Sequence, residues 1–379
     1  MSGRVRDSDE LIATARAATG LEDLGDESFR DWLDVLVDSA NADIDFHASG
    51  VDVVEGTIVR ALSNRLHLEE WYRLHPETAD TTIDGPVLIT GLPRSGTTAL
   101  VGMLAEDPEF RPLRGWEAAQ PCPPPELGRE DDDPRVDAAR AMAEAIPPEI
   151  AAMHIVDPLG AEEDHDVLNP TFCAAHFSGF WPVHRYPEAW LGADMDASFA
   201  YHERTLKLLG SRRPPSAWLL KQPLHIFSLD AFARRYPTAR FVMTHRDPAK
   251  TVPSVCSLMS WSYQTVSRTV DLECHGAFQL GYWAEGIARA LASRQRLGED
   301  RFIDVVHGDL VRDPEGQITR IYEFLGRQPT DDARAAISRY IVDHRSDAAS
   351  THQYSAAEFG LSAAVIRERF TDYVQRFDL

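Results

Sequence analysis

A glycine-bounded loop, with an arginine inside it and hydroxyl side chains at its end, is the most chemically informative feature of the sequence. The apolar run 87–90 predicts a buried strand, and residues 91–96, which begin and end with glycine, predict a tight loop. Backbone N–H groups of such a loop, with those of a helix that starts near Thr97, point at one cluster of anionic oxygens. The segment therefore predicts a phosphate-binding site.

The loop lacks the lysine of ATP-binding loops. In the pattern G-x-x-x-x-G-K-[ST], the lysine reaches the β- and γ-phosphates and the hydroxyl holds magnesium. Here Thr97 stands at the lysine position, and the fixed positive charge lies inside the loop at Arg94. We therefore expect the ligand's terminal group to differ from a magnesium-bound γ-phosphate.

A second cationic segment lies further along the chain. Residues 240–246 predict a strand that ends in Arg246, and Ser254 follows eight residues later. In this order the two segments resemble the donor site of sulfotransferases that use 3′-phosphoadenosine 5′-phosphosulfate (PAPS). The run 93–98, Pro-Arg-Ser-Gly-Thr-Thr, is similar to the family's 5′-phosphosulfate loop, and the arginine and serine are similar to the pair that grips the ribose 3′-phosphate.

The resemblance covers residues 85–379 and is nearest to the bacterial and tyrosylprotein branch, because the loop carries arginine rather than lysine. It implies PAPS as the donor, adenosine 3′,5′-bisphosphate (PAP) as the product, and a reaction that needs no metal. Arg246 and Ser254 are implied to bind the 3′-phosphate, and Arg94 to stabilise the leaving phosphate. The residues implied to hold the 5′-phosphosulfate are Pro93, Arg94, Ser95, Gly96, Thr97 and Thr98.

Lysine is rare in this chain, which draws attention to one position. Only three of the 38 lysine and arginine residues are lysines, and one of them, Lys221, ends an apolar run that predicts a strand at 217–221. Lysine is a compact point charge that can release a proton, whereas guanidinium stays charged. The segment resembles the family's Lys-x-Pro element, which implies that Lys221 reaches the bridging oxygen of the donor.

Two residues are candidates for the general base that takes the proton of the acceptor hydroxyl. Glu117 follows the expected phosphate-binding helix, where the tyrosylprotein branch has a Gly-Glu-Glu segment with its catalytic glutamate, and we favour it. His225 lies four residues after Lys221, not two as in the Lys-x-His of the cytosolic branch. A base must reach the acceptor hydroxyl, and sequence spacing does not measure that reach.

The acidic run 162–166 contains carboxylates and a histidine that could bind a metal. Prolines on both sides break any helix that would align these ligands, and no H-E-x-x-H spacing occurs, so we expect a solvated loop or the rim of an acceptor pocket. His154, His165 and His176 recur every eleven residues. The same prolines make coincidence the better interpretation of that spacing.

Composition excludes several classes of protein. The formal net charge of −22 over 379 residues repels nucleic acid and sulfated glycans as partners. The four cysteines are scattered without a Cys-x-x-Cys pair, which indicates neither a disulfide framework nor a zinc site. The sequence has no basic region followed by an apolar run, and no apolar stretch approaches the ~18 residues of a membrane span. We expect a cytoplasmic protein without integral membrane association; the sequence does not indicate an oligomeric state.

The pattern of apolar residues predicts an α/β fold. We expect a P-loop-like, three-layer architecture with a central parallel sheet, whose apolar strands are buried on both faces. Residues 1–84 predict a helical N-terminal extension, and residues 85–379 a sulfotransferase catalytic domain. Within that domain, the proline-rich and aromatic segment 111–215 predicts a helical insertion that forms the acceptor lid. The expected strands are 87–90, 217–221, 240–245 and 302–306.

These observations predict a sulfotransferase that moves a sulfuryl group from PAPS to a hydroxyl of a small, apolar molecule by in-line displacement. The first alternative is a P-loop nucleotide kinase or NTPase. The missing lysine argues against it, as does a strand at 240–245 that leads into arginine rather than ending in an aspartate for magnesium. The second alternative is a non-catalytic nucleotide-binding protein. No pattern in the expected lid separates sterol, phenol, lipid, glycan and peptide hydroxyls as acceptors.

Overall fold

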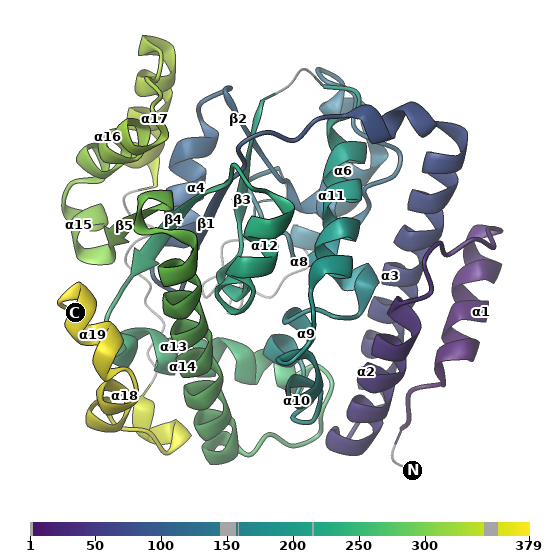
Figure 1. Ribbon diagram of the computed structural model, residues 1–379. Coiled ribbons are helices and arrows are strands. Elements are labelled where there is room, and N and C mark those ends of the chain that lie inside the picture. The colour runs from purple at the N-terminus through teal and green to yellow at the C-terminus, as the bar shows by residue number, and fades with distance from the viewer. Residues whose placement is uncertain (1–2, 145–156, 158, 214–215, 345–354) are drawn as a thin grey trace.

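The computed structural model describes residues 3–144, 157, 159–213, 216–344 and 355–379, and its centre is a parallel sheet (Figure 1). Across these described residues, five strands pair in the order β2-β3-β1-β4-β5. The strands are β1 (Val87–Gly91), β2 (Phe110–Pro112), β3 (Ala217–Lys221), β4 (Arg240–His245) and β5 (Phe302–Val306). The predicted α/β fold and its four predicted strands are confirmed. The short edge strand β2 was not predicted.

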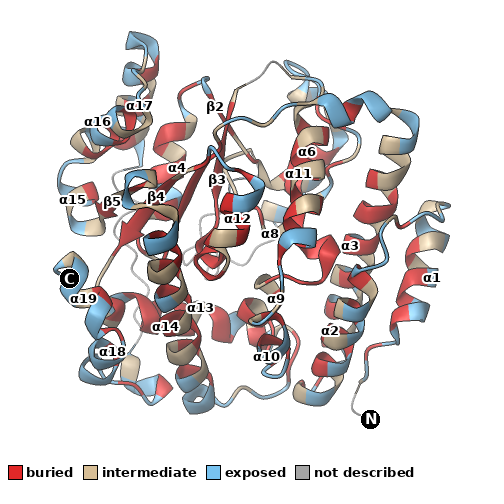
Figure 2. Cartoon of the chain, viewed as in Figure 1, coloured by how far each residue is buried: buried red, intermediate tan, exposed pale blue. Residues whose placement is uncertain are grey.

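Apolar side chains on both sides of its strands explain why the sheet is covered on both faces. All five residues of β1 are buried, and so are all five of β3. Leu88 and Leu220 belong to the core on one face, whereas Val87, Ile89 and Leu219 belong to the core on the other. Successive side chains of a strand point to opposite faces, so each strand contributes to both cores. Figure 2 shows the buried strands between helices whose outer faces are exposed.

Helices form the two outer layers. The face that contains Val87 packs against α4 (Thr97–Ala105), α15 (His307–Arg312), α16 (Pro314–Leu325) and α17 (Asp331–Asp343). The opposite face packs against α12 (Leu229–Arg235), α13 (Pro248–Gln264) and α14 (Leu272–Leu297). The chain ends with α18 (Ala363–Arg369) and α19 (Thr371–Phe377). No helix in the described part of the chain is both long enough and apolar enough to cross a membrane.

The N-terminal segment is helical, as predicted for 1–84. It contains α1 (Ser8–Thr19), α2 (Phe29–Asp43), α3 (Ala48–Leu74) and a 3-10 turn, η1 (Pro76–Asp80). These helices lie on the side of the molecule away from α15 to α19 (Figure 1). Their apolar side chains join the core that also covers Leu88 and Leu220 of the sheet. The packing of these helices is therefore continuous with that of the rest of the chain.

The segment predicted to be a lid is built from short helices. Their bounds are α5 (Gly115–Ala119), α6 (Pro134–Glu144), α8 (His165–Leu168), α9 (His176–Phe180), α10 (Tyr186–Trp190) and α11 (Asp196–Gly210). Most of its aromatic side chains are buried, including Phe172, Phe177, Tyr186 and Trp190. Several of these rings therefore serve as core. Part of the segment, residues 145–156 and 158, lies outside the described residues.

Candidate active site

The glycine-bounded loop connects β1 to α4, and its two glycines have conformations that suit no other residue. Gly91 has φ of 142° and Gly96 has φ of 99°. A Cβ atom at Gly91 would lie 2.3 Å from the carbonyl oxygen of Thr244 on the neighbouring strand. Inside the loop, Arg94 also has a positive φ, 66°, which is uncommon for a residue with a side chain. Positive φ angles at Gly91, Arg94 and Gly96 thus make the loop a strained turn.

Replacing Gly91 by alanine should therefore destabilise the fold. We expect the free energy of unfolding to fall by roughly 3 kcal/mol, because the new methyl group meets backbone and the φ is unfavourable. Chemical denaturation measures this change. The control is Gly281→Ala in α14, where a Cβ meets nothing within 4 Å, and where alanine should stabilise the helix by up to about 1 kcal/mol. Equal stability of the two variants would contradict the strained-loop interpretation.

The residues predicted to bind the donor come together at this loop. Arg94 Nε donates to Ser254 Oγ at 3.3 Å, and Arg246 Nη1 donates to the carbonyl oxygen of Arg94 at 2.8 Å. Arg246 directly follows β4, and Ser254 lies on α13, so the two ends of the predicted site converge although they are far apart in sequence. Pro93, Ser95, Gly96, Thr97 and Thr98 form the rest of the loop and the first turn of α4.

His307 is a further residue beside this loop that sequence reasoning missed. Its ring carbon Cδ2 would lie 3.3 Å from a Cβ added at Gly96. Burial and the Arg246 guanidinium lower the pKa of His307 to about 4. The histidine is therefore neutral at pH 7, and the arginine is the cation that repels its protonation. A positive field of this kind favours an anionic ligand.

Lys221 lies at the carboxyl end of β3, and its side chain is buried among carboxylates. Lys221 Nζ lies 3.0 Å from Glu163 Oε1 and 3.6 Å from Glu162 Oε1. Burial alone lowers the pKa of Lys221, but Glu163 and Glu162 outweigh it, and the net shift raises the pKa. The group is therefore an ammonium ion at neutral pH.

Asp164, the next residue in the chain, faces a different group of side chains. Asp164 Oδ2 lies 2.9 Å from His225 Nε2 and 3.2 Å from His202 Nε2, and all three side chains are buried. The other ring nitrogen of His202 lies 2.7 Å from the hydroxyl of Tyr236. Burial opposes the charge on Asp164, but the two histidines hold the pKa of its carboxyl well below its usual range. His225 is thus oriented by a buried carboxylate.

The same three side chains have the composition of a possible cation site. One ligand atom from each of Asp164, His202 and His225 lies within 4.8 Å of the others. Two imidazoles and a carboxylate suit zinc or another transition metal. Asp164 Oδ2 already lies within hydrogen-bond distance of both rings, whereas Asp164 Oδ1 is buried without a hydrogen-bond partner among the described residues. The expectation of a metal-free reaction stays a prediction.

For residues 162–166 we expected a solvated loop or the rim of an acceptor pocket. The solvated loop is wrong for Asp164, which is fully buried, whereas His165 of the same run lines a pocket. Bridges between Arg114 and Ala161 and between Glu163 and Lys221 draw this segment alongside the end of β3. The cause is a long-range attraction, since buried Lys221 needs counter-charges and the acidic run supplies them. Sequence patterns report no such pairing between distant segments.

His165 and His176 lie side by side, although no continuous helix connects them. Their rings stack with centroids 4.3 Å apart and an interplanar angle of 6°, and Phe180 stacks on His176 at 4.2 Å. The chain brings them together by turning between α8 and α9, which needs no continuous helix. Burial lowers the pKa of His165, but Asp166 and Glu163 outweigh this effect, and the net shift raises the pKa to about 9. Burial and the neighbouring His165 place the pKa of His176 well below its ordinary value. His154 lies outside the described residues.

Glu117, the favoured base candidate, lies on α5 with a fully buried side chain. Its carboxylate lies 3.4 Å from Arg111 Nη2 and 3.6 Å from Arg213 Nη2, and it accepts from the Arg114 N–H at 3.5 Å. Desolvation by burial lowers the pKa of Arg111 to about 10, despite this carboxylate. By contrast, the side chains of Glu162 and Glu163, which contact Lys221, keep 22% and 18% of their exposure.

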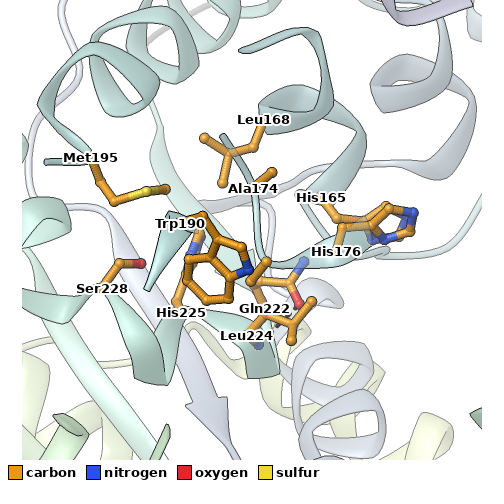
Figure 3. Close-up of a pocket in the computed structure, with 11 residues that line it drawn as sticks. His165, Leu168, Ala174, His176, Trp190, Met195, Gln222, Leu224, His225 and Ser228 are labelled. Atoms are coloured by element: carbon orange, nitrogen blue, oxygen red, sulfur yellow. Dashed lines mark hydrogen bonds between the residues drawn. The ribbon is translucent and has the colours of Figure 1, made fainter. Parts of the chain in front are cut away.

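A pocket lies beside His165, His176 and His225 (Figure 3). The space in it that the centre of a water-sized molecule can occupy is about 20 Å³. Figure 3 shows the stacked rings of His165 and His176 at one side of this pocket and Met195 with Ser228 at the opposite side. Gln222 and His225, from the segment that follows Lys221, also line it. Its apolar lining comes from Leu168, Ala174, Ala175, Trp190, Met195 and Leu224.

Comparison with known proteins places this arrangement in a family. The profile of the sulfotransferase family matches residues 86–332. The chain is 24% identical to the omega-hydroxy-beta-dihydromenaquinone-9 sulfotransferase Stf3 of Mycobacterium bovis over 171 residues. This match covers 42% of the chain and 40% of that protein, so it spans less than half the length of the curated relative.

Two solved structures match over nearly the whole chain. Sulfotransferase STF1 from Mycobacterium tuberculosis is 30% identical with a TM-score of 0.87, and the match covers 97% of this chain and 99% of that one. Sulfotransferase STF9 from Mycobacterium avium is 29% identical with a TM-score of 0.92, and the match covers 99% of this chain and 97% of that one. The family expected from the loop, the strand with its arginine and the Lys-x-Pro element is thereby confirmed, and the chain belongs to the sulfotransferase family.

Proposed function

We propose that the protein transfers the sulfuryl group of PAPS to a hydroxyl of a small, apolar acceptor. The main observation in support is that Arg94, Arg246 and Ser254 come together at the glycine-bounded loop. This loop has Thr97 where ATP-binding loops have lysine. In the reaction, a bond forms between the acceptor oxygen and sulfur as the bond from sulfur to the bridging oxygen breaks. The hydroxyl proton passes to a base, and PAP leaves with the electron pair.

The donor is held at two places in this proposal. The N–H groups of residues 93–98 and Arg94 bind the 5′-phosphosulfate and stabilise the charge that grows on the leaving phosphate. Arg246 and Ser254 bind the 3′-phosphate, the arginine as a charge-assisted donor. Arg94, proposed for the 5′-phosphosulfate, contacts Ser254, proposed for the 3′-phosphate. The two proposed phosphate sites therefore adjoin each other, as binding of one donor molecule requires.

Lys221 and a neighbouring carboxylate complete the proposed reaction centre. Lys221 is the cation for the bridging oxygen, and its contacts favour Glu163 as the base, since this carboxylate lies 3.0 Å from the lysine nitrogen. Glu117 and His225 stay alternatives for the base. Glu117 lies among arginines, and His225 faces the pocket with Asp164 behind it. The acceptor would enter the pocket beside these groups.

Calorimetric titration with PAP, run beside ATP with magnesium, tests the donor site. We expect PAP to bind without metal and more tightly than magnesium ATP. Arg246→Ala should weaken PAP binding about 10- to 100-fold, because a hydrogen bond between charged groups is lost. The matched control is Arg312→Ala, whose side chain keeps 76% of its exposure, and its affinity for PAP should stay unchanged.

The outcomes of this titration separate the alternatives. Preference for magnesium ATP would replace the sulfotransferase proposal by a kinase or NTPase. PAP binding without transfer from labelled PAPS to any member of an acceptor panel would favour the non-catalytic nucleotide-binding protein. The cytoplasmic location expected from the sequence stays a prediction.

A further inference from the structure

Asp164, His202 and His225 meet at one point of the interior, although they come from three separate elements. Asp164 directly precedes α8, His202 lies on α11, and His225 lies in a 3-10 turn, η4 (Pro223–Phe227), that follows β3. Asp164 Oδ2 lies 2.9 Å from His225 Nε2 and 3.2 Å from His202 Nε2. Each residue thus presents one possible ligand atom to the same small region, and these atoms lie within 4.8 Å of one another.

The two distances suit a metal ion shared by the three side chains. Ligand atoms bound to one zinc ion at about 2.0–2.2 Å, with tetrahedral or octahedral angles, lie about 2.8–3.6 Å from one another. Both distances from Asp164 Oδ2 fall in this range. Hydrogen bonds span much of the same range, so the charge and the remaining polar atoms of the group must decide between the two.

The charge of Asp164 favours a metal ion. Its side chain is fully buried, and within the described part of the chain its ion-pair contacts are with the two imidazoles, not with lysine or arginine. Buried Glu117, by contrast, faces Arg111 and Arg213. Burial of a carboxylate is costly unless a cation and hydrogen bonds compensate it. Asp164 Oδ1 is also buried and has no hydrogen-bond partner among the described residues, so the protein leaves this carboxylate only partly satisfied.

The side of His202 that points away from Asp164 is arranged as in metal sites. Its Nδ1 lies 2.7 Å from the hydroxyl of Tyr236. A histidine that binds a metal through one ring nitrogen almost always donates the hydrogen of the other to an oxygen, which fixes the orientation of the ring. The oxygen of Tyr236 can accept that hydrogen. Nδ1 of His202 then carries the hydrogen, and Nε2 presents its lone pair to the group.

A further ligand can come from the pocket, because His225 also lines it. The pocket offers about 20 Å³ to the centre of a water molecule, and ~10–15 Å³ is enough to hold one. Where a protein supplies three ligands to zinc, water commonly occupies the fourth position.

We propose that Asp164, His202 and His225 bind a divalent transition-metal ion, and that zinc is the best match to two imidazoles and a carboxylate. The ion joins two helices of the segment 111–215 to the turn η4, and none of its ligands belongs to the donor loop. A metal on Nε2 makes His225 a ligand rather than a base, which agrees with Glu163 as the proposed base. The inference does not depend on the transfer reaction.

Titration of the full chain, without an affinity tag and after treatment with a chelator, tests the proposal. We expect calorimetry to show binding of one zinc ion per chain. At a zinc concentration 100-fold above Kd, the Tm should rise by about 3 °C, because the ion binds the folded chain. Cobalt(II) in place of zinc should give the visible absorption bands of a four- or five-coordinate site with nitrogen and oxygen ligands. These three measurements need no variant.

Variants then assign the ion to this site. Asp164→Asn should weaken zinc binding more than about 100-fold, since a direct ligand loses its charge, and Tyr236→Phe about 10- to 100-fold, the range for loss of an outer partner. Tyr236→Phe removes only the hydroxyl behind His202, so it tests the site even if Asp164→Asn fails to fold. The matched control is His75→Gln, whose side chain keeps 39% of its exposure, and its affinity for zinc should stay unchanged.

Two results would overturn the proposal. The first is a wild-type protein that binds neither zinc nor cobalt. The second is zinc binding that neither Asp164→Asn nor Tyr236→Phe weakens, which would assign the ion to other histidines of the chain.

Discussion

Replacing Lys221 by methionine should lower kcat for sulfuryl transfer about 10²- to 10³-fold, the range seen when one stabilising group is lost from a transition state. Methionine keeps most of the length of the buried side chain but removes the charge that we propose for the bridging oxygen. The affinity for PAP should change little, because Arg94, Arg246 and Ser254 hold the phosphates. Single-turnover kinetics with labelled PAPS measures the chemical step.

The control for this variant is Lys207→Met. Lys207 lies on α11 and donates to the carbonyl oxygen of Ala79, away from the donor loop, so kcat should not change. Lys221→Arg is informative as well, because a guanidinium in this buried position cannot release a proton and needs more room. Full activity of Lys221→Met, with normal PAP binding, would remove Lys221 from the reaction centre.

Replacing Glu163 by glutamine should lower kcat about 10²- to 10⁴-fold, the range for loss of a general base. The substitution keeps shape and size but removes both the proposed base and one counter-charge of Lys221; Glu162→Gln, which removes the other counter-charge, separates the two effects. The comparison variants are Glu162→Gln, Glu117→Gln and His225→Gln, each measured under the same conditions. The largest loss of kcat in one of these three would move the role of the base to that residue.

Glu117→Gln should differ from the others in its effect on stability. Its carboxylate is the counter-charge of Arg111, whose side chain keeps only 6% of its exposure. Loss of a partner from a buried ion pair costs about 3–5 kcal/mol of unfolding free energy, because a charge remains buried without compensation. Thermal and chemical denaturation of all four variants separates this structural effect from a catalytic one.

The local pattern of residues was sufficient to predict four of the five strands and the donor loop. The apolar runs that form β1, β3, β4 and β5 are visible because each strand is buried on both faces. The loop is visible because its backbone conformation requires glycine at Gly91 and Gly96. The edge strand β2 has three residues, which is too few for any periodicity.

Contacts between distant segments explain what the sequence could not show. Glu163 and Lys221 are 58 residues apart, and nothing in either segment indicates the other. The environment of Glu117 depends on Arg213, which lies at the other end of the segment 111–215 in the sequence. A residue's type indicates which chemistry it can perform, but its burial and neighbours decide whether it performs it.

Three consecutive residues, Glu163, Asp164 and His165, face three different groups: Lys221, His202 with His225, and His176. Insertion or deletion of one residue here would shift all three contacts at once, since they share one stretch of backbone. A change of acceptor preference that keeps these three contacts therefore requires substitutions within this run or changes of length outside it.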